Sequence, residues 1–204
     1  MSTTVPASPN RFAWRAVDII VASALGVAAG IVFWGWNLLS AATQITAVLE
    51  AALPGVQAIF YGIWLFAGVL GGLIIRKPGA AVFVELVAAS VSALLGAQWG
   101  YLTLESGLVQ GLAAELIFLV FFYRNWRWYV AVLAGAAAGL AMAINDLILW
   151  YPGAAAAFAT IYTISAVVSG ALIAGLGSWA LARGLAATGA LNRFAIGREA
   201  AARV

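Results

Sequence analysis

Every lysine and arginine of this chain falls in one of four clusters, and long apolar stretches separate the clusters. They are Arg11 and Arg15, then Arg76 and Lys77, then Arg124 and Arg127, and finally Arg183, Arg193, Arg198 and Arg203. Two hydrophobic spans fit between each pair of neighbouring clusters. Short loops rich in Lys and Arg stay on the cytoplasmic side of a membrane. The pattern therefore predicts a multi-pass membrane protein with both termini in the cytoplasm.

The composition supports a lipid environment. Apolar residues make up 65% of the chain and charged residues only 8%, whereas a soluble domain carries about 25% charged residues. The net charge is +3. We interpret the basic residues behind it as groups that orient the loops and contact lipid headgroups, rather than as a nucleic-acid surface. The chain has no histidine and no cysteine, which excludes disulfides and metal sites built on those ligands. We expect no metal and no cofactor.

The hydrophobic pattern predicts an all-α, compact bundle of six transmembrane helices. A spanning helix needs about 20 mostly apolar residues, and such spans can be placed at 17–39, 56–75, 79–97, 104–122, 129–150 and 157–182. Residues 1–16 would form a cytoplasmic N-terminal segment, 17–182 the transmembrane domain and 183–204 a basic cytoplasmic tail. The turn from Arg76 to Gly79 divides two spans, because Pro78 stops a helix and glycine admits positive φ. The expected outer loops at 40–55, 98–103 and 151–156 contain no Lys or Arg.

Small residues recur at every fourth position of the first span, and such rows let helix backbones approach closely in lipid. One row consists of Ala22, Gly26 and Gly30, and a second consists of Ala24 and Ala28. Two interpretations stay open. The rows pack inside the bundle, or the first helix presents one of them to a partner membrane protein.

Four acidic residues fall within or at the ends of the expected spans. Ionisable side chains in hydrocarbon cost several kcal/mol and are usually functional. Asp18 lies at the start of the first span close to Arg15, which predicts an ion pair or a helix N-terminal charge. Glu85 and Glu115 each lie about two turns from the inner end of a span with no Lys or Arg at that depth. Three interpretations stay open: the carboxyl groups are protonated, they accept hydrogen bonds from neutral groups, or they bind a cationic ligand. For Asp146 an interfacial cap and a ligand contact stay open.

Aromatic and amide side chains gather toward the outer ends of the spans. The residues that we single out are Asn37, Tyr61, Trp64, Gln98, Trp99 and Gln110. Amides in a dry environment need partners, and aromatic walls favour stacking and cation–π contacts. We expect a pocket open to the outside, with carboxylates below, for a small, flat ligand that is cationic or rich in N–H donors.

Three stretches carry a family resemblance: residues 61–64 (YGIW), 76–85 (RKPGAAVFVE) and 110–115 (QGLAAE). They resemble the YkoE family, the substrate-binding (S) components of energy-coupling-factor (ECF) transporters associated with thiamine or its hydroxymethylpyrimidine (HMP) precursor. The resemblance extends from about Trp14 to Gly189. It implies six helices, an outward-facing pocket and a complex with a transmembrane coupling protein and two ATPases in a bacterial cytoplasmic membrane. The ligand contacts that it implies are Glu85, Gln98, Trp99, Gln110 and Glu115.

We therefore predict a subunit that captures thiamine or HMP and is not an enzyme. The sequence has no phosphate-binding loop of the Gly-x-x-x-x-Gly-Lys type, so ATP hydrolysis needs another subunit. The expected binding set combines two glutamates, two amides, three stacking rings and two further polar residues: Glu85, Glu115, Gln98, Gln110, Tyr61, Trp64, Trp99, Asn37 and Asp146. Three alternatives stay open: a proton-coupled secondary transporter without ATPases, an intramembrane enzyme built on a Glu85–Glu115 pair, and a structural subunit.

Overall fold

The structure, a computed structural model, describes residues 12–202, and the regular elements in that range are helices. In chain order they are α1 (Ala16–Thr43), α2 (Ile45–Ala52), the 3-10 helix η1 (Val56–Trp64), α3 (Phe66–Ile75), α4 (Ala80–Leu94), α5 (Leu102–Val120), α6 (Trp128–Leu149), α7 (Ala156–Ser169), the π-helix η2 (Gly170–Gly177), α8 (Ser178–Ala187) and α9 (Ala195–Ala201). Arg11 and Arg203, together with most of the predicted N-terminal segment, lie outside the described residues.

Five helical segments of the described chain are long and apolar enough to cross a membrane. They are Ala16–Thr43, Val56–Ile75, Leu102–Val120, Trp128–Leu149 and Ala156–Ala187. Helix α4 corresponds to the predicted span 79–97 and is also apolar, but it has only 15 residues. The predicted all-helical, multi-pass architecture is confirmed.

The helices differ in detail from the predicted spans. Helix α1 extends to Thr43, and the expected loop 40–55 contains α2, which starts after Gln44 in a left-handed backbone conformation (φ 53°). The second span changes at Leu65 from a 3-10 helix to an α-helix. The last span contains a π-helical section and continues to Ala187 rather than ending at residue 182. The hydrophobic pattern sets the length of a span but not these local changes of helix type.

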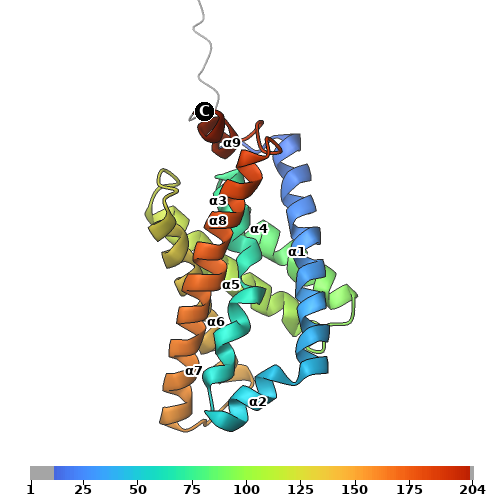
Figure 1. Cartoon of the computed structure of the whole chain (residues 1–204), viewed down its shortest axis with the longest axis vertical. Coiled ribbons are helices and arrows are strands. Elements are labelled where there is room, and N and C mark those ends of the chain that lie inside the picture. The colour runs from blue at the N-terminus through green and yellow to red at the C-terminus, as the bar shows by residue number, and fades with distance from the viewer. Residues whose placement is uncertain (1–11, 203–204) are drawn as a thin grey trace, which may run out of the picture.

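Figure 1 shows α1 on one side of the bundle and the continuous rod α7–η2–α8 on the other, with α3, α4, α5 and α6 between them. Helix α1 packs against α4, α4 against α5, α5 against α6, and α6 against α7 and η2. The start of α1, the α3–α4 turn, the α5–α6 loop, the end of α8 and α9 lie at one end, which we call the basic end (Figure 1). Helix α2 and the loop after α6 lie at the opposite end, and the loop after α4 lies part-way between the two ends, beside the lower half of α1 (Figure 1).

A buried ion-pair network ties α1 to the α3–α4 turn at the basic end. The turn contains Arg76 and Gly79 with φ of 57° and 83°. Asp18 is fully buried; its Oδ1 lies 2.7 Å from Nη2 of Arg15, and its Oδ2 contacts Nζ of Lys77. The predicted pairing of Asp18 with Arg15 is confirmed, and the structure adds Lys77. Since Lys77 and Arg15 flank one carboxylate, this end of the bundle is held together by charge as well as by packing.

The two small-residue rows of α1 have different surroundings. Ala22, Gly26 and Gly30 are buried against α4, and a Cβ at Gly26 would lie 2.6 Å from a valine side chain of that helix. Ala24 and Ala28 are exposed. The first row is therefore covered within the chain, and only the second is free to meet another protein.

Candidate functional site

A cavity of about 130 Å³ lies toward the opposite end of the bundle, lined by residues of α1, η1, α4, α5, α6 and α7 and by two loops. Six of the nine predicted binding residues line it: Tyr61, Trp64, Glu85, Trp99, Gln110 and Asp146. These side chains come from four helices and one loop, so the fold assembles a site that is dispersed along the sequence.

Glu85 provides the buried acidic group of this cavity. Its side chain is 1% exposed, and Oε2 accepts a hydrogen bond of 2.5 Å from the backbone N–H of Gly68 on α3. Its second oxygen, Oε1, has no hydrogen-bond partner among residues 12–202. Leaving a buried polar atom without a partner costs about 1–3 kcal/mol. This oxygen is therefore available to a donor that enters the cavity.

Two polar groups of α5 share the cavity with Glu85. Gln110 is 8% exposed, and its side-chain amide makes no hydrogen bond within the described chain. The buried hydroxyl of Thr103 also lacks a partner there. An amide offers both a donor and an acceptor. Together with Glu85 these groups can bind a ligand edge that presents several donors and acceptors.

Aromatic rings form the walls of the cavity. The ring centroids of Tyr61 and Trp64 lie 5.0 Å apart, and those of Trp64 and Trp99 lie 5.5 Å apart, both in edge-to-face geometry. The indole N–H of Trp64 donates to Oδ1 of Asn37 over 2.9 Å. Asn37 does not line the cavity, but it fixes the orientation of a ring that does. Edge-to-face packing leaves ring faces available for a flat ligand.

Asp146 lines the cavity near the loop that follows α6. Its Oδ2 accepts a hydrogen bond of 2.5 Å from the hydroxyl of Tyr162, and Tyr162 contacts Tyr151 with ring centroids 5.4 Å apart. Burial raises the pKa of Tyr151, and the nearby carboxylate of Glu50 raises it further. The Tyr151 hydroxyl therefore stays neutral and can act as a hydrogen-bond donor.

Comparisons with known proteins agree with this geometry. Residues 17–141 match the family described as the permease component of the ABC-type cobalt transport system. A relative named HMP/thiamine permease protein YkoE, from Bacillus subtilis (strain 168), is 35% identical over 188 residues, covering 91% of this chain and 92% of the relative. The crystal structure of an S-component of an ECF transporter matches with a TM-score of 0.85 and 32% identity, covering 94% of this chain and 95% of that one. The chain belongs to the YkoE family of ECF-transporter S components.

This family and this fold are those of transport subunits rather than enzymes. The described residues of this S component contain no group of three or more His, Cys, Asp or Glu side chains that could hold a metal ion.

Glu115 does not line the cavity, although it was predicted to contact the ligand together with Glu85. Its Oε1 accepts hydrogen bonds of 2.7 Å from the backbone N–H of Gly79 and from the hydroxyl of Tyr123, and its Oε2 accepts one of 2.8 Å from the N–H of Ala81. The carboxylate thus caps the free N–H groups at the start of α4. Burial and the contact with Glu115 raise the pKa of Tyr123, which keeps the phenol protonated as a donor. Glu85 and Glu115 therefore accept hydrogen bonds from different donors, and no hydrogen bond links them within residues 12–202.

Gln98 also lies outside the cavity, because its side chain is exposed in the loop after α4. Conversely, the predicted binding set left out ten lining residues, and five of these carry a hydroxyl group: Ser92, Thr103, Ser106, Tyr151 and Tyr162. The positions of Tyr151 and Tyr162 could have been predicted from the sequence. A short loop joins α6 to α7, so residues just after α6 and early in α7 face Asp146. Ser92 and Thr103 carried no such signal, because isolated hydroxyls are common in membrane helices.

Proposed function

We propose that this S component captures thiamine or HMP in the cavity around Glu85. The observation that carries the proposal is the Oε1 atom of Glu85, a buried acceptor without a partner in the described chain, on a residue that lines a cavity with aromatic walls. The HMP/thiamine name of the Bacillus relative supports the choice of ligand.

The aminopyrimidine ring, which thiamine and HMP share, suits this site chemically. Its exocyclic amine donates to Oε1 of Glu85, and its ring nitrogen and amine edge match the amide of Gln110. Its flat faces stack on the ring faces that Tyr61, Trp64 and Trp99 leave open to the cavity. The positively charged thiazolium, which only thiamine carries, would extend toward Asp146. One deep subsite therefore serves both ligands, and the outer part distinguishes them.

Orientation and partners complete the proposal. The basic end faces the cytoplasm by the positive-inside rule, so the cavity opens outward. Since both terminal segments then lie in the cytoplasm, the number of membrane crossings is even, and α4 is the short sixth crossing. The protein works in a bacterial cytoplasmic membrane with a transmembrane coupling protein and two ATPases that drive uptake. The exposed Ala24 and Ala28 face of α1 is the surface on which we place the coupling protein.

The direct test is a ligand panel on the purified protein in detergent, read by quenching of tryptophan fluorescence. Thiamine and HMP should both bind, because Trp64 and Trp99 line the site. A hydroxyethyl-thiazolium fragment without the pyrimidine should bind at least about tenfold more weakly than thiamine, since it makes no contact with Glu85. Equal binding of the fragment and thiamine, or no binding of either vitamin compound, would refute the proposed site.

A further inference from the structure

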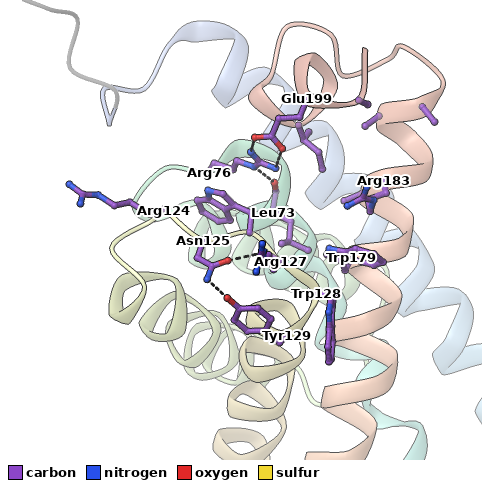
Figure 2. A pocket seen from close by; sticks show the side chains of 16 residues that line it. Leu73, Arg76, Arg124, Asn125, Arg127, Trp128, Tyr129, Trp179, Arg183 and Glu199 are labelled. Carbon is purple, nitrogen blue, oxygen red and sulfur yellow. Dashed lines mark hydrogen bonds and ion pairs between the residues drawn. The ribbon is translucent and has the colours of Figure 1, made fainter. Parts of the chain in front are cut away.

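A second cavity of about 680 Å³ lies at the basic end, between the end of α3, the α5–α6 loop, α8 and α9. Figure 2 shows its arginines: Arg76 near α9, Arg127 from the α5–α6 loop, Arg183 from α8, and Arg124 reaching away from the others. Among the described lining residues the acidic side chain is Glu199. The ligand-capture site described above uses none of these residues.

The charges of this cavity are unbalanced. Arg76 makes a two-point ion pair with Glu199, with N–O distances of 2.5 and 2.9 Å (Figure 2). Arg124, Arg127 and Arg183 have no ion pair within residues 12–202. Since Arg124 reaches away, Arg127 and Arg183, which are both exposed, are the guanidinium groups left to contact a ligand, and their charge favours an anion.

Tryptophan rings hold the guanidinium planes at two sides of the cavity. The guanidinium carbon of Arg183 lies 4.8 Å from the ring centroid of Trp179, and that of Arg76 lies 5.4 Å from the ring centroid of Trp126. Stacking of this kind reduces the freedom of the arginine side chains before a ligand binds. A planar guanidinium presents paired N–H groups that match the oxygens of a phosphate.

The position along the bundle points to the source of the phosphate. The last span, Ala156–Ala187, has 32 residues, and its α-helical parts α7 and α8, with 14 and 10 residues, alone span about 36 Å at 1.5 Å per residue. The hydrocarbon core is only about 30 Å thick, so the end of α8 with Arg183 extends into the headgroup layer. Trp128, 55% exposed beside the cavity, is typical of the same layer. The cavity is therefore open to lipid headgroups of the leaflet at the basic end.

We propose that this cavity binds a phosphate-bearing anion, supplied by the headgroup of an anionic phospholipid. Arg127 and Arg183 bind the phosphate oxygens, and the apolar wall from Leu73, Ala182 and Ile196 faces the glycerol and upper acyl carbons. An occupied site would join α8 to the α5–α6 loop and anchor the basic end at the membrane surface.

The test compares two charge-matched double variants of the full chain in detergent–lipid micelles. Arg127→Gln with Arg183→Gln removes both proposed ligands, and Arg193→Gln with Arg198→Gln removes two arginines of the tail that do not line the cavity. Native mass spectrometry measures binding of phosphatidylglycerol against phosphatidylcholine. In separate samples, inorganic phosphate is titrated in micelles without anionic lipid. Thermal unfolding checks that both variants fold.

We expect the first variant to lose the preference for phosphatidylglycerol by about tenfold or more and the tail variant to keep it within about twofold. Binding of inorganic phosphate that the first variant alone loses would support the phosphate site and assign it to a soluble source. Equal losses in both variants would overturn the proposal, because they would indicate general attraction between charges. An unchanged preference in a folded first variant would also overturn it.

Discussion

Replacing Glu85 with glutamine tests the central contact of the capture site with almost no change of shape. In the structure Oε2 of Glu85 accepts a hydrogen bond of 2.5 Å from the N–H of Gly68, and Oε1 has no partner in the described chain although Glu85 lines the cavity. A glutamine keeps the bond to Gly68 through its amide oxygen. Its NH₂ group then takes the place of Oε1, so a donor replaces the acceptor that the ligand amine needs.

The magnitude follows from this exchange. Leaving the ligand amine without its buried acceptor costs about 1–3 kcal/mol, which corresponds to about 5- to 150-fold weaker binding. The amide could turn over, but its NH₂ group would then face the N–H of Gly68 and leave that buried donor without an acceptor, at a cost of about 1–3 kcal/mol. Both orientations of the substituted amide therefore weaken binding.

The assay is titration calorimetry or tryptophan quenching with thiamine and with HMP, and both ligands should lose affinity by a similar factor. The unfolding temperature should change little, because Oε1 has no protein partner in the described chain to lose. If the folded Glu85→Gln protein bound both compounds within about twofold of the original affinity, Glu85 would not be a ligand contact and the proposed site would be abandoned.

Three further changes separate the roles of the other residues. Asp146→Asn, which can keep the hydrogen bond from Tyr162, should weaken the binding of thiamine by about 1–2 kcal/mol, or about 5- to 30-fold. The affinity for HMP, which lacks the cation, should change less than about threefold. Equal losses of affinity for thiamine and HMP, measured by calorimetry, would contradict the placement of the thiazolium. Glu115→Gln should lower the stability by about 1–3 kcal/mol in thermal unfolding, since one N–H at the start of α4 loses its acceptor, yet keep thiamine affinity within about threefold. A large loss of thiamine affinity in a folded Glu115→Gln protein would indicate that Glu115 contacts the ligand. Ala24→Leu with Ala28→Leu should leave thiamine binding intact but reduce vesicle uptake with the partner subunits at least about tenfold; full uptake would remove this face from the coupling interface.

The helical spans could be predicted because each depends on a property that is local in sequence. Length and hydropathy locate α1, α5, α6 and the last span to within a few residues, and the Pro–Gly turn fixes the boundary before α4. Helix α2 was not predictable in the same way. Its boundary depends on one left-handed residue, Gln44, and glutamine has no strong preference for that conformation.

The site was predictable in its composition but not in its geometry. Counting turns places Glu85 and Glu115 at similar depth, but it does not give the direction in which each side chain points or which donors compete for it. Glu115 lies beside the uncapped N–H groups of α4, which satisfy its carboxylate. Asn37 was included for its polarity, whereas its contribution is to hold the indole of Trp64.

The two glutamates show which property of a buried acid indicates a ligand. Both are less than 10% exposed, so burial does not distinguish them. Every oxygen of Glu115 accepts a hydrogen bond from the protein, whereas one oxygen of Glu85 accepts none within residues 12–202. A folded chain tolerates an unsatisfied buried acceptor when a bound partner restores the lost hydrogen bond. The same reasoning applies at the basic end with opposite charge, where Arg76 is satisfied by Glu199 and Arg127 has no carboxylate in the described chain. In both cavities the group without a protein partner defines the chemistry of the expected ligand: a donor-rich ring beside Glu85 and a phosphate beside Arg127.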